Sequence, residues 1–233
     1  MKVLRGKTLN APKVMIYGLA GVGKSTLASK FSKPIFLDFE GGVDYLGVDR
    51  TPTLQTYEEA MNYLVALKSA QERTYDTIVI DSVDWLVRKA IEKTAGISRG
   101  KLEETLNRSN GGYGNGKQVL ENHIRSDLMW LLVECTKKGY TICLIAHADK
   151  KTLMDADGAD IEQVAPKIDV NTMNVFVEWC DDIFYLKKDA NGERVLVLES
   201  DDNALAKNRL GLTGEIKIDD KFDINELLKG KEK

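Results

Sequence analysis

The sequence predicts an α/β protein built on a mostly parallel, twisted β-sheet, with helices on both faces and an antiparallel extension near the C-terminus. Two observations carry this prediction. Short runs of β-branched and apolar residues alternate with segments of helical periodicity, as expected for strands joined by crossover helices. A Gly-rich turn, residues 18–25, stands between the first apolar run and the first helical segment.

The composition limits the domain organisation and excludes several classes of function. With 233 residues, 43% of them hydrophobic, the chain can bury a large core. We therefore expect a single domain over residues 1–233, with its core at about 13–218, a short N-terminal arm and a charged C-terminal tail. A net charge of −3 excludes a globally basic nucleic-acid coat but leaves room for a local basic groove.

The cysteines and the hydropathy indicate the compartment. Cys135, Cys143 and Cys180 lie in apolar segments without a C-x-x-C pair, which is typical of reduced, buried thiols in a cytoplasmic protein. No run of about 18 apolar residues occurs, and the first residues lack an apolar signal region. We therefore expect neither a membrane span nor secretion.

The first half of the chain is expected to contain three strands and three helices. Thr56 and Glu59 have the spacing of a capping box, which predicts the start of a helix. Gly96 is a suitable stop for another. The expected strands are residues 14–17, 34–39 and 77–80, and the expected helices are 24–31, 56–70 and 84–94.

The second half alternates polar loops with regular elements. Residues 98–116 are rich in Gly and predict a mobile loop, and residues 150–166 predict a second polar loop. Apolar residues at spacings of three and four predict one long amphipathic helix over 117–138. Strands are expected at 141–146, 183–186, 195–198 and 215–218, with a turn at 189–192.

One motif carries a specific chemistry. The segment GLAGVGKS matches the phosphate-binding pattern G-x-x-x-x-G-K-[ST] and lies between a predicted strand and a predicted helix. Its glycines let successive backbone N–H groups face phosphate oxygens. Lys24 is expected to reach the β- and γ-phosphates of ATP, and the Ser25 hydroxyl to bind Mg²⁺. The expected nucleotide-binding residues of this P-loop are Gly18, Leu19, Ala20, Gly21, Val22, Gly23, Lys24, Ser25 and Thr26.

Acidic residues at two strand ends are expected to complete the site. Asp81 ends the strand TIVI and is expected to hold the Mg²⁺ shell, although an Asp here can instead cap the next helix. Glu40 ends the strand IFLDFE and is expected to orient or deprotonate the attacking water. Asp38 is its competitor on the same side of the strand, and a solvated strand-end acid is the alternative reading of Glu40.

Two further features can be interpreted either as parts of a functional site or as ordinary structural features. His147 ends the strand LIAH, where a polar side chain could contact the γ-phosphate, but a histidine there is often just hydrogen-bonded. Lys207 and Arg209 lie in AKNRLGLTGEI, between the last predicted strands. Two spaced cations in a turn are usually a solvated surface feature.

The order of these parts resembles the RecA-like ATPase core over residues 13–218. IFLDFEGG is similar to the RecA segment that supplies a catalytic glutamate, here Glu40, and His147 stands where RecA has a glutamine sensor. AKNRLGLTGEI is similar to a late segment of DnaB-type hexameric helicases. Together with GLAGVGKST, YDTIVIDS, the GYGNG loop and LIAHADKK, these segments resemble phage-encoded P-loop nucleotide-binding proteins, some of which are single-strand annealing recombinases made of the RecA core alone.

The resemblance implies partners as well as a fold. Lys207 and Arg209 would act in trans on the nucleotide of the next protomer, which requires a head-to-tail ring or filament. The two predicted loops would face single-stranded DNA, although mobile loops without DNA contact are the alternative. The implied DNA-binding residues are Arg99, Lys101, Arg108, Tyr113, Lys117, Lys150, Lys151 and Lys167.

The function expected on this basis is a Mg²⁺- and ATP-dependent ATPase that binds single-stranded DNA as an oligomer in recombination or annealing, in the cytoplasm of the host cell if phage-encoded. The alternative is an accessory or helicase-related ATPase that works mainly through a single-strand-binding or replication protein. A small-molecule P-loop kinase would need an Arg-rich lid, and the second loop holds Lys and Asp instead.

Overall fold

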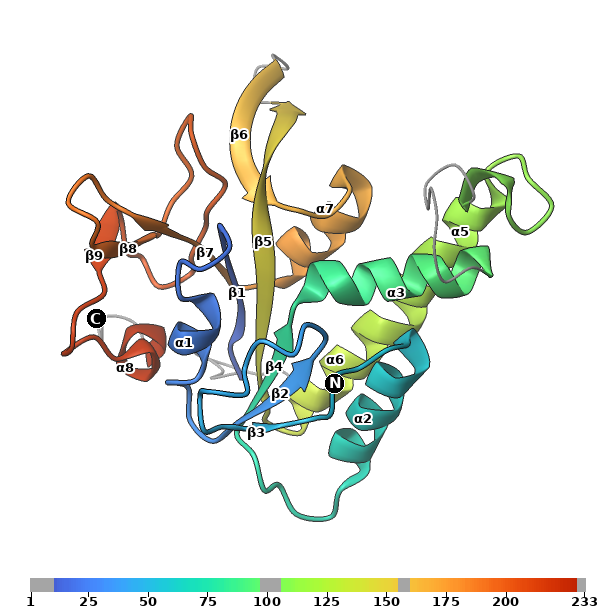
Figure 1. Cartoon of the computed structure of the whole chain (residues 1–233), viewed down its shortest axis with the longest axis horizontal. Coiled ribbons are helices and arrows are strands. Elements are labelled where there is room, and N and C mark those ends of the chain that lie inside the picture. The colour runs from blue at the N-terminus through green and yellow to red at the C-terminus, as the bar shows by residue number, and fades with distance from the viewer. Residues whose placement is uncertain (1–10, 97–105, 155–159, 230–233) are drawn as a thin grey trace, which may run out of the picture.

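The computed structural model describes residues 11–96, 106–154 and 160–229. Within these ranges the chain forms a nine-stranded sheet in the order β3-β2-β4-β5-β1-β7-β8-β9, with β6 paired to β5 (Figure 1). The strands are β1 (Lys13–Gly18), β2 (Pro34–Asp38), β3 (Asp49–Arg50), β4 (Thr77–Asp81), β5 (Thr141–Met154), β6 (Asp160–Pro166), β7 (Asp182–Lys188), β8 (Arg194–Val197) and β9 (Glu215–Lys217).

The pairing confirms the predicted fold class. From β3 to β7 all neighbours along the sheet are parallel, whereas β8 and β9 add to β7 as an antiparallel extension. Parallel strands bring their carboxyl ends to one edge of the sheet. The ends of β1, β2 and β4 therefore meet at a common edge, which we call the carboxyl edge, and β5 passes this edge at His147, opposite Gly18.

Helices cover both faces of the sheet. Residues of β1 alternate between two apolar cores, with Met15 and Tyr17 in one and Val14 and Ile16 in the other. The first core lies under α2, α3, α5, the π-helical segment η1, α6 and α7, and the second lies under α1 and α8 (Figure 1). The helices are α1 (Lys24–Ala28), α2 (Tyr57–Ser69), α3 (Val83–Ala95), α5 (Asn115–Asn122), η1 (His123–Leu128), α6 (Met129–Lys137), α7 (Val170–Trp179) and α8 (Ile224–Lys229).

Local sequence signals fix several helix ends as predicted. Thr56 Oγ1 accepts a hydrogen bond from the Glu59 N–H, and the Glu59 carboxylate accepts one from the Thr56 N–H, each at 3.2 Å. This capping box begins α2. Gly96 ends α3 with a φ of 67°, a left-handed conformation that favours glycine.

Two predicted helices differ in detail. The first helix is α-helical only to Ala28, because the next N–H groups bond three residues back, Lys30 to Leu27 and Phe31 to Ala28. The long helix predicted over 117–138 begins at Asn115 and is interrupted by η1. At the first residue of η1, the His123 carbonyl accepts a hydrogen bond from Tyr57 Oη at 2.7 Å.

The two predicted loops also differ from the structure. Residues 97–105 and 155–159 lie outside the described part, but residues 106–108 are helical. The loop predicted at 150–166 is wrong, because β5 runs on to Met154 and pairs with β6 in an antiparallel hairpin. This hairpin projects from the sheet, so its residues are polar where a buried strand would be apolar, and the strand pattern was hidden (Figure 1).

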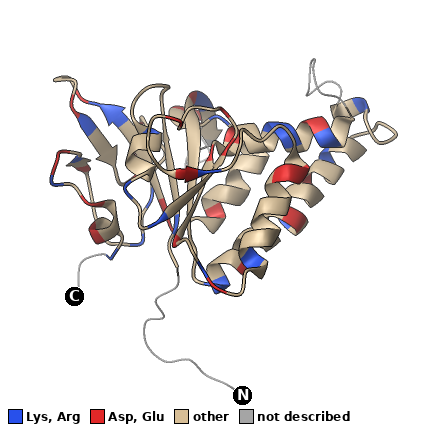
Figure 2. Cartoon of the chain, turned by 60° about the horizontal axis from the view of Figure 1, so that its bottom comes forward, with Lys and Arg blue, Asp and Glu red and all other residues tan. Residues whose placement is uncertain are grey.

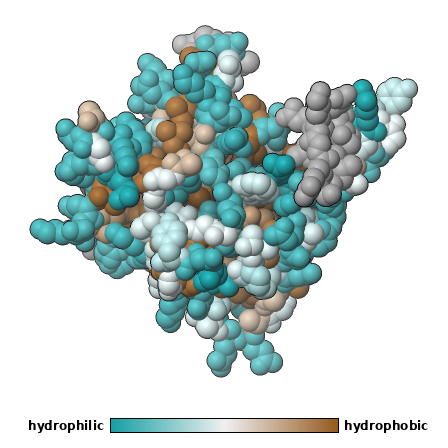
Figure 3. Space-filling view, viewed as in Figure 1, coloured by the Kyte–Doolittle hydropathy of each residue, from teal (hydrophilic) through white to brown (hydrophobic). Residues whose placement is uncertain are grey.

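The surface mixes charges and hydrophobic residues. Lysine, arginine, aspartate and glutamate are interspersed along the helices that cover the first core (Figure 2). In the view of Figure 3 the surface is largely hydrophilic, with hydrophobic residues visible mainly toward its middle.

Candidate nucleotide-binding site

The P-loop leaves the carboxyl end of β1 in a backbone path that requires glycine. A Cβ atom at Gly18 would lie 2.3 Å from the Leu186 carbonyl oxygen of β7, which is too close for any other residue. Gly21 and Gly23 have φ values of 73° and 104°. The loop then enters α1 at Lys24, so backbone N–H groups curl around the space at the carboxyl edge.

Lys24 is buried inside this curl. Its Nζ donates to the Gly18 and Leu19 carbonyl oxygens, both at 3.1 Å. Burial lowers the pKa of Lys24, while the carboxylates of Asp81 and Glu40 oppose this shift. The ammonium group is thus held in the loop, where a phosphate chain could take the place of the carbonyl partners.

Ser25 and Asp81 meet as the sequence predicts. Ser25 Oγ donates to Asp81 Oδ2 at 2.6 Å. Burial raises the pKa of Asp81 to about 6, against the hydrogen bond from Ser25, which lowers it. A buried carboxylate beside a hydroxyl, at the mouth of a phosphate-binding loop, fits a Mg²⁺ ion.

The small number of protein ligands also fits Mg²⁺. Among the described residues no group of three or more His, Cys, Asp or Glu side chains could hold a metal ion. Magnesium is usually held by one or two carboxylates together with water and substrate phosphates, so Ser25 and Asp81 are a sufficient protein contribution. When bound, the ion would supply positive charge between the phosphates.

Glu40 lies in a polar network at the carboxyl edge, between β2, β4 and the middle of β5. Ser82 Oγ donates to Glu40 Oε1 at 2.7 Å, and His147 Nε2 lies 3.8 Å from Glu40 Oε2. On its other side His147 Nδ1 lies 2.9 Å from Asp84 Oδ2. The structure thus brings Glu40 and His147 together, as predicted, and adds Ser82 and Asp84, which the sequence analysis did not assign to the site.

The ionisation of this network follows from its contacts. The hydrogen bond to Asp84 raises the pKa of His147, against the effect of partial burial. Burial opposes the charge on Asp84, but the hydrogen bonds from His147 outweigh it and lower the pKa of Asp84. His147 and Asp84 therefore favour an imidazolium–carboxylate pair that faces Glu40.

Asp38, the predicted competitor of Glu40, has a structural role. Its carboxylate is buried, and Oδ1 accepts hydrogen bonds from the Glu40 and Gly41 N–H groups, both at 2.9 Å. These contacts fix the turn that presents Glu40. The geometry favours Glu40 over Asp38 as the residue that meets a water molecule.

Arg194 also lies at the P-loop and was missed by the sequence analysis. Its Nε donates to the Val22 carbonyl at 2.8 Å. A lone arginine at the start of a strand carries no motif, so only the register of β8 could have pointed to it.

Lys207 and Arg209 lie away from the P-loop of their own chain. Lys207 pairs through its backbone with Ile183, near the amino end of β7. The register of β1 and β7 sets Asp182 beside Val14, at the end of β1 opposite to the P-loop. The segment is therefore at the amino edge of the sheet.

Asn208, between the two cations, closes their turn. Its side chain donates to the Leu198 and Leu212 carbonyls and accepts from the Leu210 and Leu212 N–H groups, at 2.8 to 3.0 Å. Lys207 Nζ turns back to the Val177 carbonyl. Arg209 points outward, with 69% of its side chain exposed and one ion pair to Asp181 at 3.2 Å.

The candidate DNA-binding residues stand on two projections with α7 between them (Figure 1). Tyr113 and Lys117 are exposed beside and on α5, and Lys150 and Lys151 lie on β5 of the hairpin. The Lys167 N–H donates to the His147 carbonyl at 2.8 Å, which places Lys167 at the hairpin base, next to the P-loop network. Arg108 is exposed on the α5 side, and Arg99 and Lys101 lie outside the described residues.

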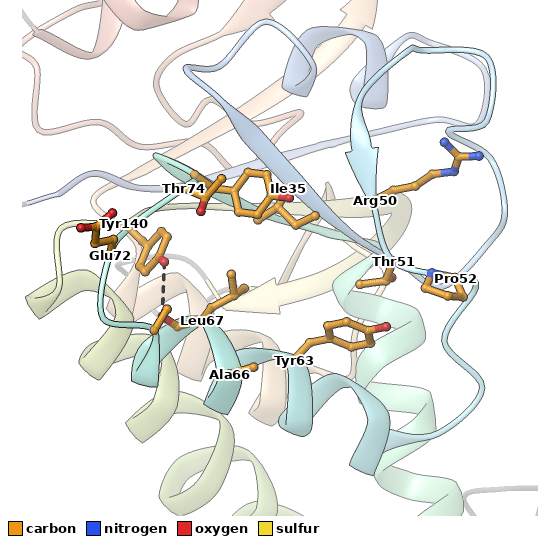
Figure 4. Close-up of a pocket in the computed structure, with 12 residues that line it drawn as sticks. Ile35, Arg50, Thr51, Pro52, Tyr63, Ala66, Leu67, Glu72, Thr74 and Tyr140 are labelled. Carbon is orange, nitrogen blue, oxygen red and sulfur yellow. Dashed lines mark hydrogen bonds between the residues drawn. The ribbon is translucent and has the colours of Figure 1, made fainter.

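A cavity of about 380 Å³ lies elsewhere, between β2, β3 and the second half of α2 (Figure 4). Tyr63, Tyr75 and Tyr140 line it, and Tyr140 Oη donates to the Leu67 carbonyl at 3.2 Å. Ile35 near the start of β2 lies in its wall, so the cavity opens toward the amino edge. It is separate from the nucleotide-binding site.

This fold and site define a P-loop ATPase with a RecA-like sheet. Residues 10–210 match the family described as AAA domain, and the chain belongs to that family. The crystal structure of the RadB recombinase is similar, with a TM-score of 0.51 and 19% sequence identity over 88% of this chain and 86% of the other. That likeness concerns the fold.

A curated relative comes from a prophage. The SPbeta prophage-derived uncharacterized protein YorG of Bacillus subtilis (strain 168) is 26% identical over an alignment of 199 residues that covers 83% of this chain. The chain spans just over half, 56%, of the length of that relative. These findings confirm the resemblance predicted from the sequence, to phage-encoded P-loop proteins with a RecA-like core. Among the described helices, none has the length and apolar character needed to cross a membrane.

Proposed function

We propose that this chain is a Mg²⁺- and ATP-dependent ATPase that binds single-stranded DNA as an oligomer, in the cytoplasm of a phage-infected or lysogenic cell, and acts in recombination or strand annealing. The observation that carries the ATPase proposal is the 2.6 Å contact of Ser25 with Asp81 at the mouth of the P-loop. It joins a phosphate-binding loop to a carboxylate suited to Mg²⁺.

The site residues have complementary roles in this proposal. Lys24 binds the phosphates, and Ser25 and Asp81 hold the metal ion. Glu40 orients a water molecule toward the γ-phosphate and accepts its proton. His147, held by Asp84 and close to Glu40, senses whether the γ-phosphate is present.

The hairpin provides the argument for DNA. Lys150 and Lys151 are neighbours on β5, so their side chains point to opposite faces of a projecting ribbon. Among the described residues Lys150 has one long ion pair, 3.9 Å from Glu162, and 77% of its side chain is exposed. Lys167 at the hairpin base links this ribbon to His147. Phosphates bound along the hairpin would therefore be sensed at the nucleotide-binding site.

The exposed Arg209 provides the argument for an oligomer. It lies at the amino edge and cannot serve the P-loop of its own chain, whereas a head-to-tail neighbour could present its carboxyl edge to it. Lys207 is tied to Val177 and is the weaker candidate for this role.

Steady-state ATP hydrolysis with and without single-stranded DNA tests the proposal. We expect stimulation by single strands, and its loss in Lys150→Ala/Lys151→Ala. The matched control is Lys217→Ala/Lys221→Ala, which removes two exposed lysines from the region of β9. The plot of log affinity for DNA against log salt should also become shallower by about 1.4 in the hairpin variant, about 0.7 per lost phosphate contact.

The outcome separates the two candidate functions. Hydrolysis that ignores DNA but rises with a replication protein would favour the accessory ATPase. Equal loss of stimulation in the β9 control would show that total charge, and not the hairpin, attracts DNA.

A further inference from the structure

Arg194 stands at the carboxyl edge, on the face of the sheet that carries the P-loop. It is the first residue of β8 and lies opposite Lys188 at the end of β7. Because side chains alternate along a strand, Arg194 shares a face with Leu196, which belongs to the same apolar core as Val22. The register thus directs a long cationic side chain toward the loop.

The guanidinium lies directly against the turn that precedes Lys24. Nε donates to the Val22 carbonyl at 2.8 Å, and a Cβ atom at Gly23 would come within 2.8 Å of the same Nε. The hydrogen bond to Val22 and the close approach to Gly23 therefore both place the guanidinium on the loop. A hydrogen bond through Nε fixes the plane of the guanidinium and leaves the four N–H groups on Nη1 and Nη2 for other acceptors.

The charge of Arg194 has no partner in the described part of the chain. Its Nη atoms make no hydrogen bond to the described residues, and it has no carboxylate partner there. Other arginines on the surface are paired with carboxylates: Arg50, Arg73, Arg88, Arg125 and Arg209. An unpaired cation fixed on the turn of Val22 and Gly23, which leads directly into Lys24, adds to a positive potential that suits a polyphosphate.

We propose that Arg194 is a nucleotide-binding residue in cis: Nε stays on the Val22 carbonyl while Nη1 and Nη2 donate to phosphate oxygens of the nucleotide in the P-loop. This inference rests on the proposed function of the P-loop. It adds a contact from the β8–β9 extension that is distinct from Arg209, which faces the opposite edge. Bound nucleotide would then tie the extension to the parallel core.

Calorimetric titration with Mg-ADP and with magnesium β,γ-imido-ATP at two salt concentrations tests the proposal. We expect Arg194→Gln to weaken binding about 10- to 100-fold, the range for loss of charge-assisted hydrogen bonds. Lys188→Gln is the matched control, because it removes the same charge from the neighbouring strand position, and its affinity should stay within about twofold of wild type. Affinity should also depend less on salt in Arg194→Gln than in the control.

A second measurement separates a phosphate contact from support of the loop. In ¹⁵N spectra of arginine side chains, the Nη signals of Arg194, identified by their loss in Arg194→Gln, should shift on addition of Mg-ADP. Weaker binding with unresponsive Nη signals would show that Arg194 only supports the loop. Unchanged affinity in Arg194→Gln, with binding abolished in Lys24→Ala, would overturn the inference and leave the proposed function intact. Failure of the wild-type protein to bind either nucleotide would overturn both.

Discussion

The two edges of the sheet hold their charged residues in different ways. At the carboxyl edge, Ser25 is hydrogen-bonded to Asp81, Glu40 to Ser82 and His147 to Asp84, all within one chain. At the amino edge, Arg209 has a largely exposed side chain and its ion pair to Asp181.

This difference matches the separate roles of the two edges in the proposed function. In that proposal the carboxyl edge is completed by a nucleotide and a metal ion, because its side chains are positioned by strands and turns of the same chain. The cation at the amino edge would act on a second molecule, since its own P-loop is at the other end of β1. The contrast predicts that changes at the first edge act within a protomer and changes at the second act between protomers.

The largest expected effect tests the carboxyl edge. Lys24→Ala removes the buried ammonium from the loop, and we expect Mg-ATP binding to fall below detection in calorimetry. Lys30→Ala, an exposed lysine just after α1, is the control and should bind as wild type does. Wild-type affinity in Lys24→Ala would mean that nucleotide binds elsewhere.

The next effect tests the amino edge. We expect Arg209→Ala to slow hydrolysis by about 10³-fold or more, as for other arginine fingers, while nucleotide affinity changes little. Glu40→Gln should slow it by about 10²- to 10⁴-fold. Mixing the two inactive variants should restore part of the activity, because about one interface in four would combine an intact Glu40 with an intact Arg209.

A control keeps this test specific. Asp181→Asn breaks the ion pairs of Asp181 with Arg209 and with Lys13 but keeps the Arg209 guanidinium, and it should retain activity because in the trans role only the guanidinium reaches the neighbouring nucleotide. Absence of rescue in an assembly shown to exchange subunits would assign Arg209 a role within its own chain.

The sequence was sufficient where a local pattern determines a local contact. The parallel sheet, the capping box at Thr56 and the stop at Gly96 follow from short signals that each concern a few neighbouring residues. The contact of Ser25 with Asp81 followed because parallel strands bring their ends together, whatever the details of packing.

The sequence was insufficient where a contact depends on strand register, or where strands project into solvent. The hairpin of β5 and β6 lacks a regular alternation of apolar and polar residues, although Leu153 and Val164 pack against the first core, so its strands resembled a loop. Arg194 reaches Val22 only because β8 adds to β7 in one particular register. Asp84 joins the site because α3 begins just after β4 and turns that carboxylate toward His147, a direction that no spacing in the sequence reveals.

The smallest expected effect concerns the network around His147. The hydrogen bond to Asp84 raises the pKa of His147, so the folded chain holds that proton more tightly than the unfolded chain does. The Glu40 carboxylate also raises the pKa of His147, whereas the Lys24 ammonium lowers it. The resulting stabilisation is fully present below the unfolded pKa, about 6.5, and is lost as the pH rises through the raised folded value.

His147→Gln should therefore lower the free energy of unfolding more at pH 5.5 than at pH 8.5, as measured by urea denaturation. In the wild-type chain the pKa of Asp84 is lowered because hydrogen bonds from His147 outweigh burial, so the variant also removes what lowers it and reports on the pair as a unit. His123→Gln changes the other histidine of the sequence and serves as the control. It keeps the His147–Asp84 pair, so the part of the pH dependence that comes from this pair should remain. An equal loss of stability at both pH values would mean that His147 contributes as a neutral ring. Its closeness to Glu40 would then reflect packing, and the role of a charged sensor at the carboxyl edge would have to be given up.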